Sequence, residues 1–366
     1  LANNGRLIDR RKPINFLFNS KKMIGYEGDS LAASLLANDQ ILVGRSFKYH
    51  RPRGIVASGA EEPNALINLG EGGSFEPNAR ATTTETFDGM VAVSQNHFPS
   101  LEFDVGAINS KLSQFLPAGF YYKMFIHPRS FWKHIYEPFI RKSAGLGKAP
   151  KDRDLDKYEH YYHHCEVLVV GGGIAGIQAA KSAAASGVRV MLVEQTAHWG
   201  GRAVVDGVVI DNIAAEEWIE GALAGLSVVD NVGIRNRNQG SGVYDHGYAL
   251  GYERISDHTP GDSRPRHRLW RIRCKQIVVA TGAIERPLSF AGNDIPGVML
   301  AAAVRDYVVN YGVSPGDRTV IVTNNDDAYR TAIVLKDAGL EIPLIIDARP
   351  KGGGMLMDQA IAVGIR

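Results

Sequence analysis

Cysteine is almost absent from the chain. Only Cys165 and Cys274 occur among its 366 residues, roughly a hundred positions apart. This spacing excludes a Cys-x-x-Cys redox pair, a zinc site held by cysteines and an iron–sulfur cluster held by cysteines. We therefore expect any redox chemistry to come from an organic cofactor.

Long apolar runs and an excess of charge are also missing. No stretch is apolar enough to cross a bilayer, and the first residues lack the basic and apolar regions of a signal peptide. The formal net charge is +2, so the chain has no electrostatic reason to bind nucleic acid. We expect neither a membrane nor a nucleic acid as partner, and a cytoplasmic location.

Both ends of the chain have the look of cut ends. It begins with Leu1 rather than Met and stops at Arg366, soon after a glycine-rich turn. With 45% hydrophobic residues it can still bury the cores of two domains. We expect a fragment of a longer protein.

The first hundred residues have the pattern of a small α+β domain. Strand-like stretches at 14–18, 82–87 and 90–93 surround one helical stretch, which Asp29 or Ser30 can cap. The apolar face of that helix would consist of Leu31, Leu35 and Leu36. We expect a tail at 1–12, this domain at 13–105, and a connector at 106–164 whose many aromatic side chains pack on their neighbours.

A nucleotide-binding pattern begins at Cys165. A short β-branched run, 166–170, leads into Gly171-Gly-Gly-Ile-Ala-Gly176 and then into a helix of small residues. Gly171 permits a tight turn, Gly173 lets the backbone approach a pyrophosphate, and Gly176 lets the helix pack closely on the strand. The free amides at the start of the helix then favour phosphate.

An acid follows this loop at the expected distance. A second strand at 188–193 delivers Glu194, where a carboxylate accepts hydrogen bonds from ribose hydroxyls. The same carboxylate would repel a 2′-phosphate, so NADP is disfavoured relative to NAD or FAD. Strand, loop, helix, strand and acid in register predict a Rossmann unit that binds a nucleotide.

Two later motifs narrow the class. Trp199-Gly-Gly-Arg202 gives room beside the pyrophosphate, and a strand at 276–280 ends in Thr281-Gly282. With Ala280, this end resembles the Ala-Thr-Gly segment of the two-dinucleotide flavoprotein superfamily. Together the motifs predict an α/β fold of the Rossmann-type, FAD/NAD(P)-binding kind over 165–366.

A second Rossmann-like unit begins at about residue 300 and looks degenerate. A strand at 318–322, a helix at 328–338 and a strand at 343–346 repeat the order of the first unit. The glycines are replaced by Thr323-Asn-Asn-Asp-Asp327, whose side chains can cap the helix and whose carboxylates would repel a phosphate. We expect a structural unit, without the NAD(P)H site of flavin reductases.

The chain as a whole resembles the N-terminal part of the α subunit of heterotetrameric sarcosine oxidase, with amino-acid and opine dehydrogenase α subunits as relatives. The resemblance rests on Arg51-Pro-Arg-Gly-Ile, Leu116-Pro-Ala-Gly-Phe-Tyr-Tyr-Lys, Glu137-Pro, Ile140-Arg, Ala144-Gly-Leu-Gly, Tyr244-Asp-His-Gly-Tyr-Ala, Thr281-Gly-Ala-Ile-Glu-Arg-Pro and Asn325-Asp-Asp-Ala-Tyr-Arg. It implies that 13–105 is a β-grasp, ferredoxin-like domain without a cluster, in agreement with the lack of cysteine between Gly44 and Leu69.

The resemblance also implies an activity. Sarcosine would be oxidised to glycine, with the one-carbon unit passed to tetrahydrofolate and the electrons to oxygen, giving peroxide. The β subunit would oxidise the amine on its flavin (FAD), an FMN would lie at the α/β interface, and the Rossmann site of this chain would hold an NAD that does not turn over. The γ and δ subunits would complete the heterotetramer, and folate would bind a C-terminal domain missing here.

The implied nucleotide site is carried over residue by residue, and the chain itself would supply no catalytic residue and no metal ligand. The site comprises Gly171, Gly173, Ala175, Gly176, Glu194, Gln195, Gly201 and Arg202, with Gly240, Thr281 and Gly282. Two alternatives stay open. One is an amino-acid dehydrogenase α subunit, of the hydroxyproline, proline or opine type, with a working FAD at this site. The other is a non-catalytic scaffold that the nucleotide only stabilises.

Three further clusters favour structural roles. The histidines and tyrosines of 158–164 lack a carboxylate cage for a metal. The basic and aromatic residues of 45–53 suit a subunit or domain contact better than nucleic acid. Asp245 and His246 could be an acid/base pair, but no substrate pocket accompanies them, so a structural hydrogen bond is favoured.

Overall fold

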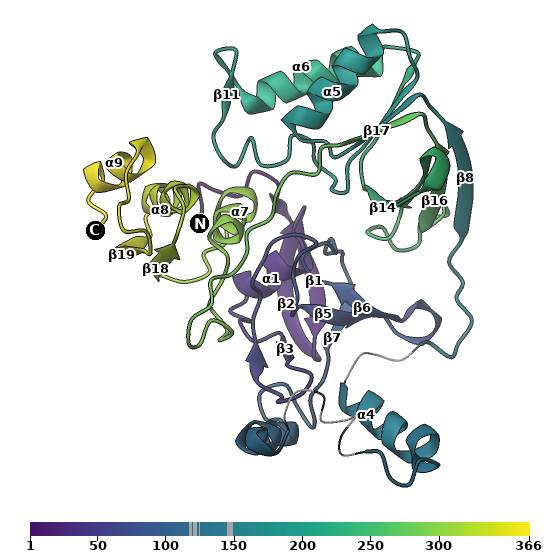
Figure 1. Cartoon of the computed structure of the whole chain (residues 1–366), viewed down its shortest axis with the longest axis vertical. Coiled ribbons are helices and arrows are strands. Elements are labelled where there is room, and N and C mark those ends of the chain that lie inside the picture. Colours follow the sequence, from purple (N-terminus) through teal and green to yellow (C-terminus); the bar gives the residue numbers. More distant parts are fainter. Residues whose placement is uncertain (117–118, 120–122, 124, 145–148) are drawn as a thin grey trace. The chain divides into compact units, whose positions relative to one another are not determined.

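The computed structural model describes residues 1–366 except 117–118, 120–122, 124 and 145–148 (Figure 1). Most of the motif that begins at Leu116 and most of the one that begins at Ala144 lie outside the described residues, as do three connector aromatics, Phe120, Tyr121 and Tyr122. The chain forms two compact units. One comprises 1–154 and 285–366, and the other comprises 155–284.

The N-terminal part of the first unit is a five-stranded sheet with one helix packed on it. The strand order is β2-β1-β7-β5-β6, with β7 parallel to β1 and β5 antiparallel to β7. The strands are β1 (Asp9–Phe18), β2 (Lys21–Glu27), β5 (Leu66–Leu69), β6 (Glu76–Arg80) and β7 (Val91–Ser94). Helix α1 (Leu31–Ala37) is capped by Ser30, whose Oγ accepts from the Ala33 amide at 3.2 Å. This mixed sheet with its covering helix agrees with the predicted small α+β domain.

One predicted strand in this domain is wrong. Residues 82–87 form turns, with a single bridge between Ser30 and Glu85. The hydroxyls of Thr83 and Thr84 bond to the Arg80 carbonyl, three and four residues earlier, at 3.3 and 2.9 Å. Such local bonds compete with strand pairing. The sequence patterns did not predict strands β5 and β6 or the short pair β3 (Gly44–Arg45) and β4 (Pro52–Arg53).

The segment after this domain contains short helical elements. They are η2 (Val105–Ala107), α2 (Ile108–Lys111), η3 (Ser113–Phe115), η4 (Trp132–Tyr136) and α4 (Glu137–Ala144). Phe131 and Trp132 are 43% and 39% exposed, so the expectation that the connector aromatics are buried is wrong for these two. The Phe125 and Phe131 rings pack on Tyr136 at centroid distances of 5.2 and 6.1 Å.

The second unit has two sheets with helices on one side (Figure 1). A parallel sheet in the order β13-β10-β9-β17 consists of β9 (Val167–Val170), β10 (Val190–Val193), β13 (Val232–Arg235) and β17 (Gln276–Val279). Helices α5 (Ile174–Ala185) and α6 (Ala215–Ser227) bury one face of it around Ile177 and Ile219. This is the Rossmann unit that the sequence predicts.

The other face of the parallel sheet is covered by the second sheet. Its order is β14-β15-β16-β8, with β14 (Asn238–Tyr244), β15 (Tyr248–Arg254), β16 (His267–Arg273) and β8 (Tyr158–His164). Trp270 and Ile272 of this sheet pack with Leu168 and Met191 of the first. A small hairpin, β11 (Val209–Ile210) and β12 (Ile213–Ala214), completes the unit. Residues 158–164, predicted as connector, are thus a strand, because β16 pairs with them along their whole length.

The C-terminal part of the chain belongs to the first unit. It consists of α7 (Ala301–Asp306), η6 (Tyr307–Tyr311), β18 (Arg318–Thr323), α8 (Asp327–Asp337), β19 (Glu341–Asp347) and α9 (Met355–Ala362). Strands β18 and β19 are parallel, as the repeated pattern predicts. Ala303 and Tyr307 join the core of the N-terminal sheet. The structure therefore divides the predicted 165–366 domain near residue 285. None of the described helices is both long and apolar enough to span a membrane.

Candidate nucleotide-binding site

The glycine loop between β9 and α5 is shaped by close backbone contacts. Gly171 has a φ of +108°, and a Cβ there would lie 2.3 Å from the Ala280 carbonyl oxygen. A Cβ on Gly176 would lie 1.8 Å from the Gly171 carbonyl oxygen. Both positions therefore require glycine, for the tight turn and for helix–strand packing as predicted.

Gly173 stands on the open side of the same loop. A Cβ on this residue would meet nothing within 4 Å. Gly173 is also the N-cap of α5, and no side chain caps that helix. The exposed Ala175 lies in its first turn. An uncapped helix start beside an open glycine leaves backbone amides available to an anion, with the helix dipole in its favour.

The turn 199–202 forms a second wall against this loop. The Gly200 amide donates to the Gly172 carbonyl at 2.7 Å, and Gly173 and Gly200 form a parallel bridge. A Cβ on Gly201 would lie 3.4 Å from the Gly173 Cα. The two glycine segments therefore touch, which places Gly201 at the loop as predicted. Arg202 follows at once, with its guanidinium 3.4 Å from the Asp206 carboxylate.

Glu194 ties the loop to the end of β10. Its carboxylate is buried, and Oε2 accepts from the Gly172 amide at 2.7 Å. Oε1 accepts from the amide and hydroxyl of Thr196 at 2.8 and 2.9 Å. A carboxylate offers about four acceptor sites, so one is left for a ribose hydroxyl. The sequence indicated the acid but could not show that it also fixes the glycine loop.

The remaining predicted residues lie around the same strand ends. Gln195 is exposed beside Glu194. A Cβ on Gly240 would lie 2.8 Å from the Val170 Cγ1, so β14 passes close to the end of β9. Thr281 and Gly282 follow β17 and are exposed, and Gly282 has a φ of +70°. Within this unit the carboxyl ends of parallel strands thus bring the predicted site together.

Two features of the site escaped the sequence analysis. Asn238, at the start of β14, is fully buried, and its amide side chain has no hydrogen-bond partner among the described residues. Its backbone amide donates to the Glu194 carbonyl at 2.8 Å. In the same unit, an open hollow of about 350 Å³ is lined by Trp199, Leu223, Ala224, Ser227, Ile234 and Asn236. Neither feature has a motif, because each depends on contacts between distant segments.

In the degenerate Rossmann-like unit at 318–347, the polar side chains bind one another. Asn325 Oδ1 caps α8 by accepting from the Asp327 amide at 3.0 Å. The Arg349 guanidinium lies 2.7 Å from the carboxylates of both Asp326 and Asp347. Its hydrogen bonds hold the pKa of Asp347 well below the usual range. Arg349 thus links the loop after β18 to the end of β19, where a dinucleotide would otherwise lie, which favours the structural role.

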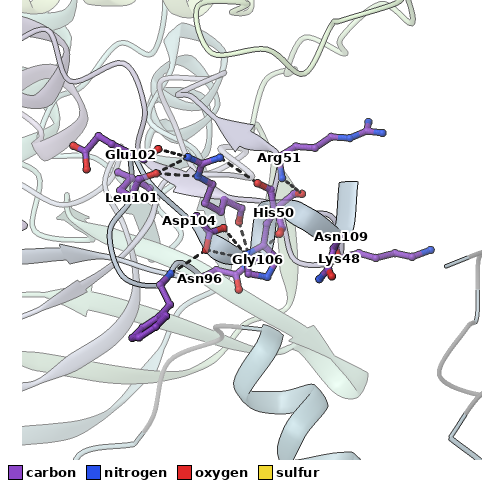
Figure 2. A network of polar contacts seen from close by, with 12 residues as sticks. Lys48, His50, Arg51, Asn96, Leu101, Glu102, Asp104, Gly106 and Asn109 are labelled. Carbon is purple, nitrogen blue, oxygen red and sulfur yellow. Dashed lines mark hydrogen bonds and ion pairs between the residues drawn. The ribbon is translucent and has the colours of Figure 1, made fainter. Parts of the chain in front are cut away.

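The basic and aromatic segment 45–53 is largely committed to internal contacts (Figure 2). Arg45 donates to the Leu101 carbonyl at 2.9 and 2.7 Å, and His50 Nδ1 lies 2.6 Å from Asp104. Burial opposes ionisation of Asp104, but hydrogen bonds from the Phe98 amide and from His50 outweigh it and lower its pKa. Arg53 pairs with Asp294 of the same unit. These bonds indicate a domain contact.

Two other polar clusters make contacts within the second unit. On β8, His160 and the Tyr162 hydroxyl bind the Arg271 guanidinium at 3.1 and 2.7 Å. No group of three or more potential metal ligands was found among the described residues. His246 has a φ of +60°, and its carbonyl accepts from Arg273 at 3.3 Å, so its role in the turn involves the backbone. Burial raises the pKa of the Cys165 thiol to about 12, so this cysteine is not a nucleophile.

Known proteins are similar to this chain over nearly its whole length. The chain is 46% identical over 98% of its length to "Sarcosine oxidase subunit alpha" of Rhizobium meliloti (strain 1021), and 33% identical over 98% to the same subunit of Corynebacterium sp. (strain P-1). It spans 37% and 33% of these relatives. The crystal structure of L-proline dehydrogenase from P. horikoshii shares the fold, with a TM-score of 0.60 and 22% identity over 95% of this chain and 57% of that one.

Two families match parts of the chain. Residues 11–97 match a 2Fe-2S iron-sulfur cluster binding domain. Such a cluster needs four ligands, normally cysteines, and this segment contains no cysteine. Its two histidines are His50, whose Nδ1 lies 2.6 Å from Asp104, and His97, whose Nε2 lies 2.8 Å from the Ser94 hydroxyl. The residues present therefore do not fit a cluster. Residues 165–363 contain the candidate nucleotide site and match the pyridine nucleotide-disulphide oxidoreductases, and the chain belongs to this family.

Proposed function

We propose that this chain is part of the α subunit of a sarcosine oxidase complex and that its glycine-loop site binds NAD. One observation carries the nucleotide proposal: Gly173 is open to solvent at the uncapped start of α5, while Glu194 fixes the neighbouring Gly172. A pyrophosphate would meet the free amides, and a ribose would meet Glu194.

NAD is favoured over NADP by charge. The Glu194 carboxylate is buried and held by three protein donors, so it cannot turn away from a 2′-phosphate. FAD offers the same pyrophosphate and the same ribose, so the loop alone does not separate it from NAD. The degenerate Rossmann-like unit at 318–347, where Arg349 joins the two strand ends, argues against a reductase. In such a reductase, NADH bound at 318–347 would reduce a flavin bound at the glycine loop.

In the proposed complex this chain binds and positions the nucleotide and does not oxidise the substrate. The overall reaction would convert sarcosine, tetrahydrofolate and oxygen to glycine, methylenetetrahydrofolate and hydrogen peroxide. Amine oxidation would take place in the β subunit, with an FMN at the α/β interface and γ and δ subunits completing the assembly. The similarity to sarcosine oxidase α subunits over nearly the whole chain supports this assignment.

The proposal is tested by identifying the bound nucleotide. The purified chain is denatured, and the released small molecules are identified by absorption spectrum and mass. A colourless protein that releases NAD supports the proposal. A yellow protein that releases FAD, and that is bleached by an amine substrate when its partner subunit is added, would instead show a dehydrogenase α subunit. Nucleotide loss that leaves turnover of the assembled complex intact would indicate a scaffold role.

A further inference from the structure

The longest loop of the first domain is organised around one carboxylate. Residues 54–65 connect β4 to β5 without regular structure. Within this loop the Glu62 side chain accepts four backbone hydrogen bonds. Oε2 accepts from the amides of Val56 and Ala57 at 2.8 and 2.7 Å, and Oε1 accepts from Asn64 and Ala65 at 2.7 and 3.1 Å.

The Glu62 carboxylate is shielded from water. The residue is 0% exposed, and no cation pairs with its carboxylate among the described residues. Arg80, the nearby cation, donates to the Glu62 backbone carbonyl instead, at 3.0 Å. Burying a carboxylate is costly unless its acceptor sites are filled. Here four amides match its acceptor capacity of about four, so the loop backbone alone stabilises the charge.

An arrangement of converging amides is an anion-binding cradle. An iron–sulfur cluster with its thiolate ligands is an anion that such amides can bind, because backbone amides donate hydrogen bonds to its sulfurs. The family that matches 11–97 binds such a cluster, yet this segment has no cysteine. We propose that the loop 54–65 is an anion-binding cradle whose ligand is the Glu62 carboxylate, supplied by the chain in place of a cluster.

The outer side of the same loop holds the C-terminal part of the unit. The Val56 carbonyl accepts from the Leu300 amide at 2.8 Å, and the Ala57 carbonyl accepts from the Tyr307 hydroxyl at 2.9 Å. The residues that donate their N–H groups to Glu62 thus present their C=O groups to the segment that contains α7. The filled cradle therefore acts as an anchor for residues 300–307 rather than as an electron relay.

Chemical rescue tests the cradle directly. In the full chain, Glu62→Ala leaves four amides without an acceptor and a cavity of carboxylate size. We expect a melting temperature lowered by roughly 5 °C or more. Sodium formate or acetate at about 100 mM should recover a large part of this loss, whereas sodium chloride at the same ionic strength should not. Glu61→Ala is the matched control, and its melting temperature should respond equally to the three salts.

A second variant and a second measurement keep the test decisive if Glu62→Ala does not fold. Glu62→Gln keeps the size but turns an NH₂ group toward two amide donors, so it should melt well below the wild type. In the wild-type chain, the amides of Val56, Ala57, Asn64 and Ala65 should exchange with solvent at least roughly tenfold more slowly than those of Gly59 and Glu61. A Glu62→Gln chain as stable as the wild type, unprotected amides, or a Glu62→Ala chain that formate and chloride affect alike would each overturn the proposal.

Discussion

Replacing Glu194 by glutamine probes the link between the glycine loop and the end of β10. The carboxylate receives three hydrogen bonds, from the Gly172 amide and from the amide and hydroxyl of Thr196. Glutamine keeps the shape but offers one acceptor oxygen, and its NH₂ group must face a donor. At least one backbone N–H is then left unpaired, namely the buried amide of Gly172 or the partly buried amide of Thr196.

The size of the effect follows from these contacts. An unsatisfied buried donor costs about 1–3 kcal/mol, and hydrogen bonds to a charged group contribute about 1.5–3 kcal/mol. We therefore expect Glu194→Gln to lower the free energy of unfolding by about 2–3 kcal/mol. For a unit of this size that corresponds to a melting temperature lower by roughly 5–10 °C. Nucleotide affinity should fall by about tenfold or more, because both the loop geometry and the ribose acceptor are altered.

Thermal unfolding and titration with NAD, followed by calorimetry, measure the two effects. Glu220→Gln is the control, since Glu220 is an exposed acid on α6 and its loss should change neither quantity. The assigned role of Glu194 is refuted if Glu194→Gln melts within 1 °C of the wild type and binds NAD with the same affinity. A difference that small is no larger than the effect of an ordinary surface substitution, about ±0.5 kcal/mol.

Three further substitutions test other parts of the molecule. Gly173→Asp should abolish nucleotide retention without unfolding the protein, because its side chain enters open space at the helix start; Gly221→Asp, also in open space, should retain the nucleotide on extraction. Burial raises the pKa of Asp29 to about 6 from 3.8, so the folded state binds its proton more tightly and stability is lost as pH rises from about 4 to 6. Asp29→Asn should remove that loss and be more stable by about 3 kcal/mol at pH 8 in chemical denaturation, and equal stability of the two proteins at pH 8 would contradict the assigned burial. Arg349→Ala should destabilise the chain only slightly, because the two ion pairs that it loses are partly exposed to solvent, and it should not create a second nucleotide site; two NAD per chain in calorimetry would show that Arg349 alone blocks it.

Consecutive residues are enough to predict the fold of the Rossmann unit. The strand, glycine loop, helix and acid from Val167 to Glu194 are found as predicted, because glycine spacing and hydrophobic period are local signals. The predictions that the structure contradicts concern segments whose conformation depends on residues far away in the chain. Residues 82–87 lie outside the sheet, where the Thr82 hydroxyl binds the carbonyl of Gly59, 23 residues earlier, and β8 became a strand because β16, over a hundred residues later, pairs with it.

In the candidate site, too, some residues can be predicted from local spacing and others cannot. Gly171, Gly176 and Glu194 follow from spacing alone. The buried amide of Asn238 and the cradle around Glu62 do not, since these residues belong to no motif. The division of the chain near residue 285 is likewise invisible in the sequence, because it depends on Tyr307 packing into the first core.

The discontinuous first unit has a consequence for synthesis on the ribosome. Residues 155–284 form one uninterrupted unit, whereas the first unit needs residues beyond 285 to complete its core. The N-terminal sheet therefore leaves the ribosome with the positions of Ala303 and Tyr307 still empty. At about 5–20 residues per second it waits on the order of ten seconds for them. The inserted unit can finish folding first. A chaperone that binds nascent chains would then find exposed apolar surface on the N-terminal sheet, although that sheet was synthesised earlier.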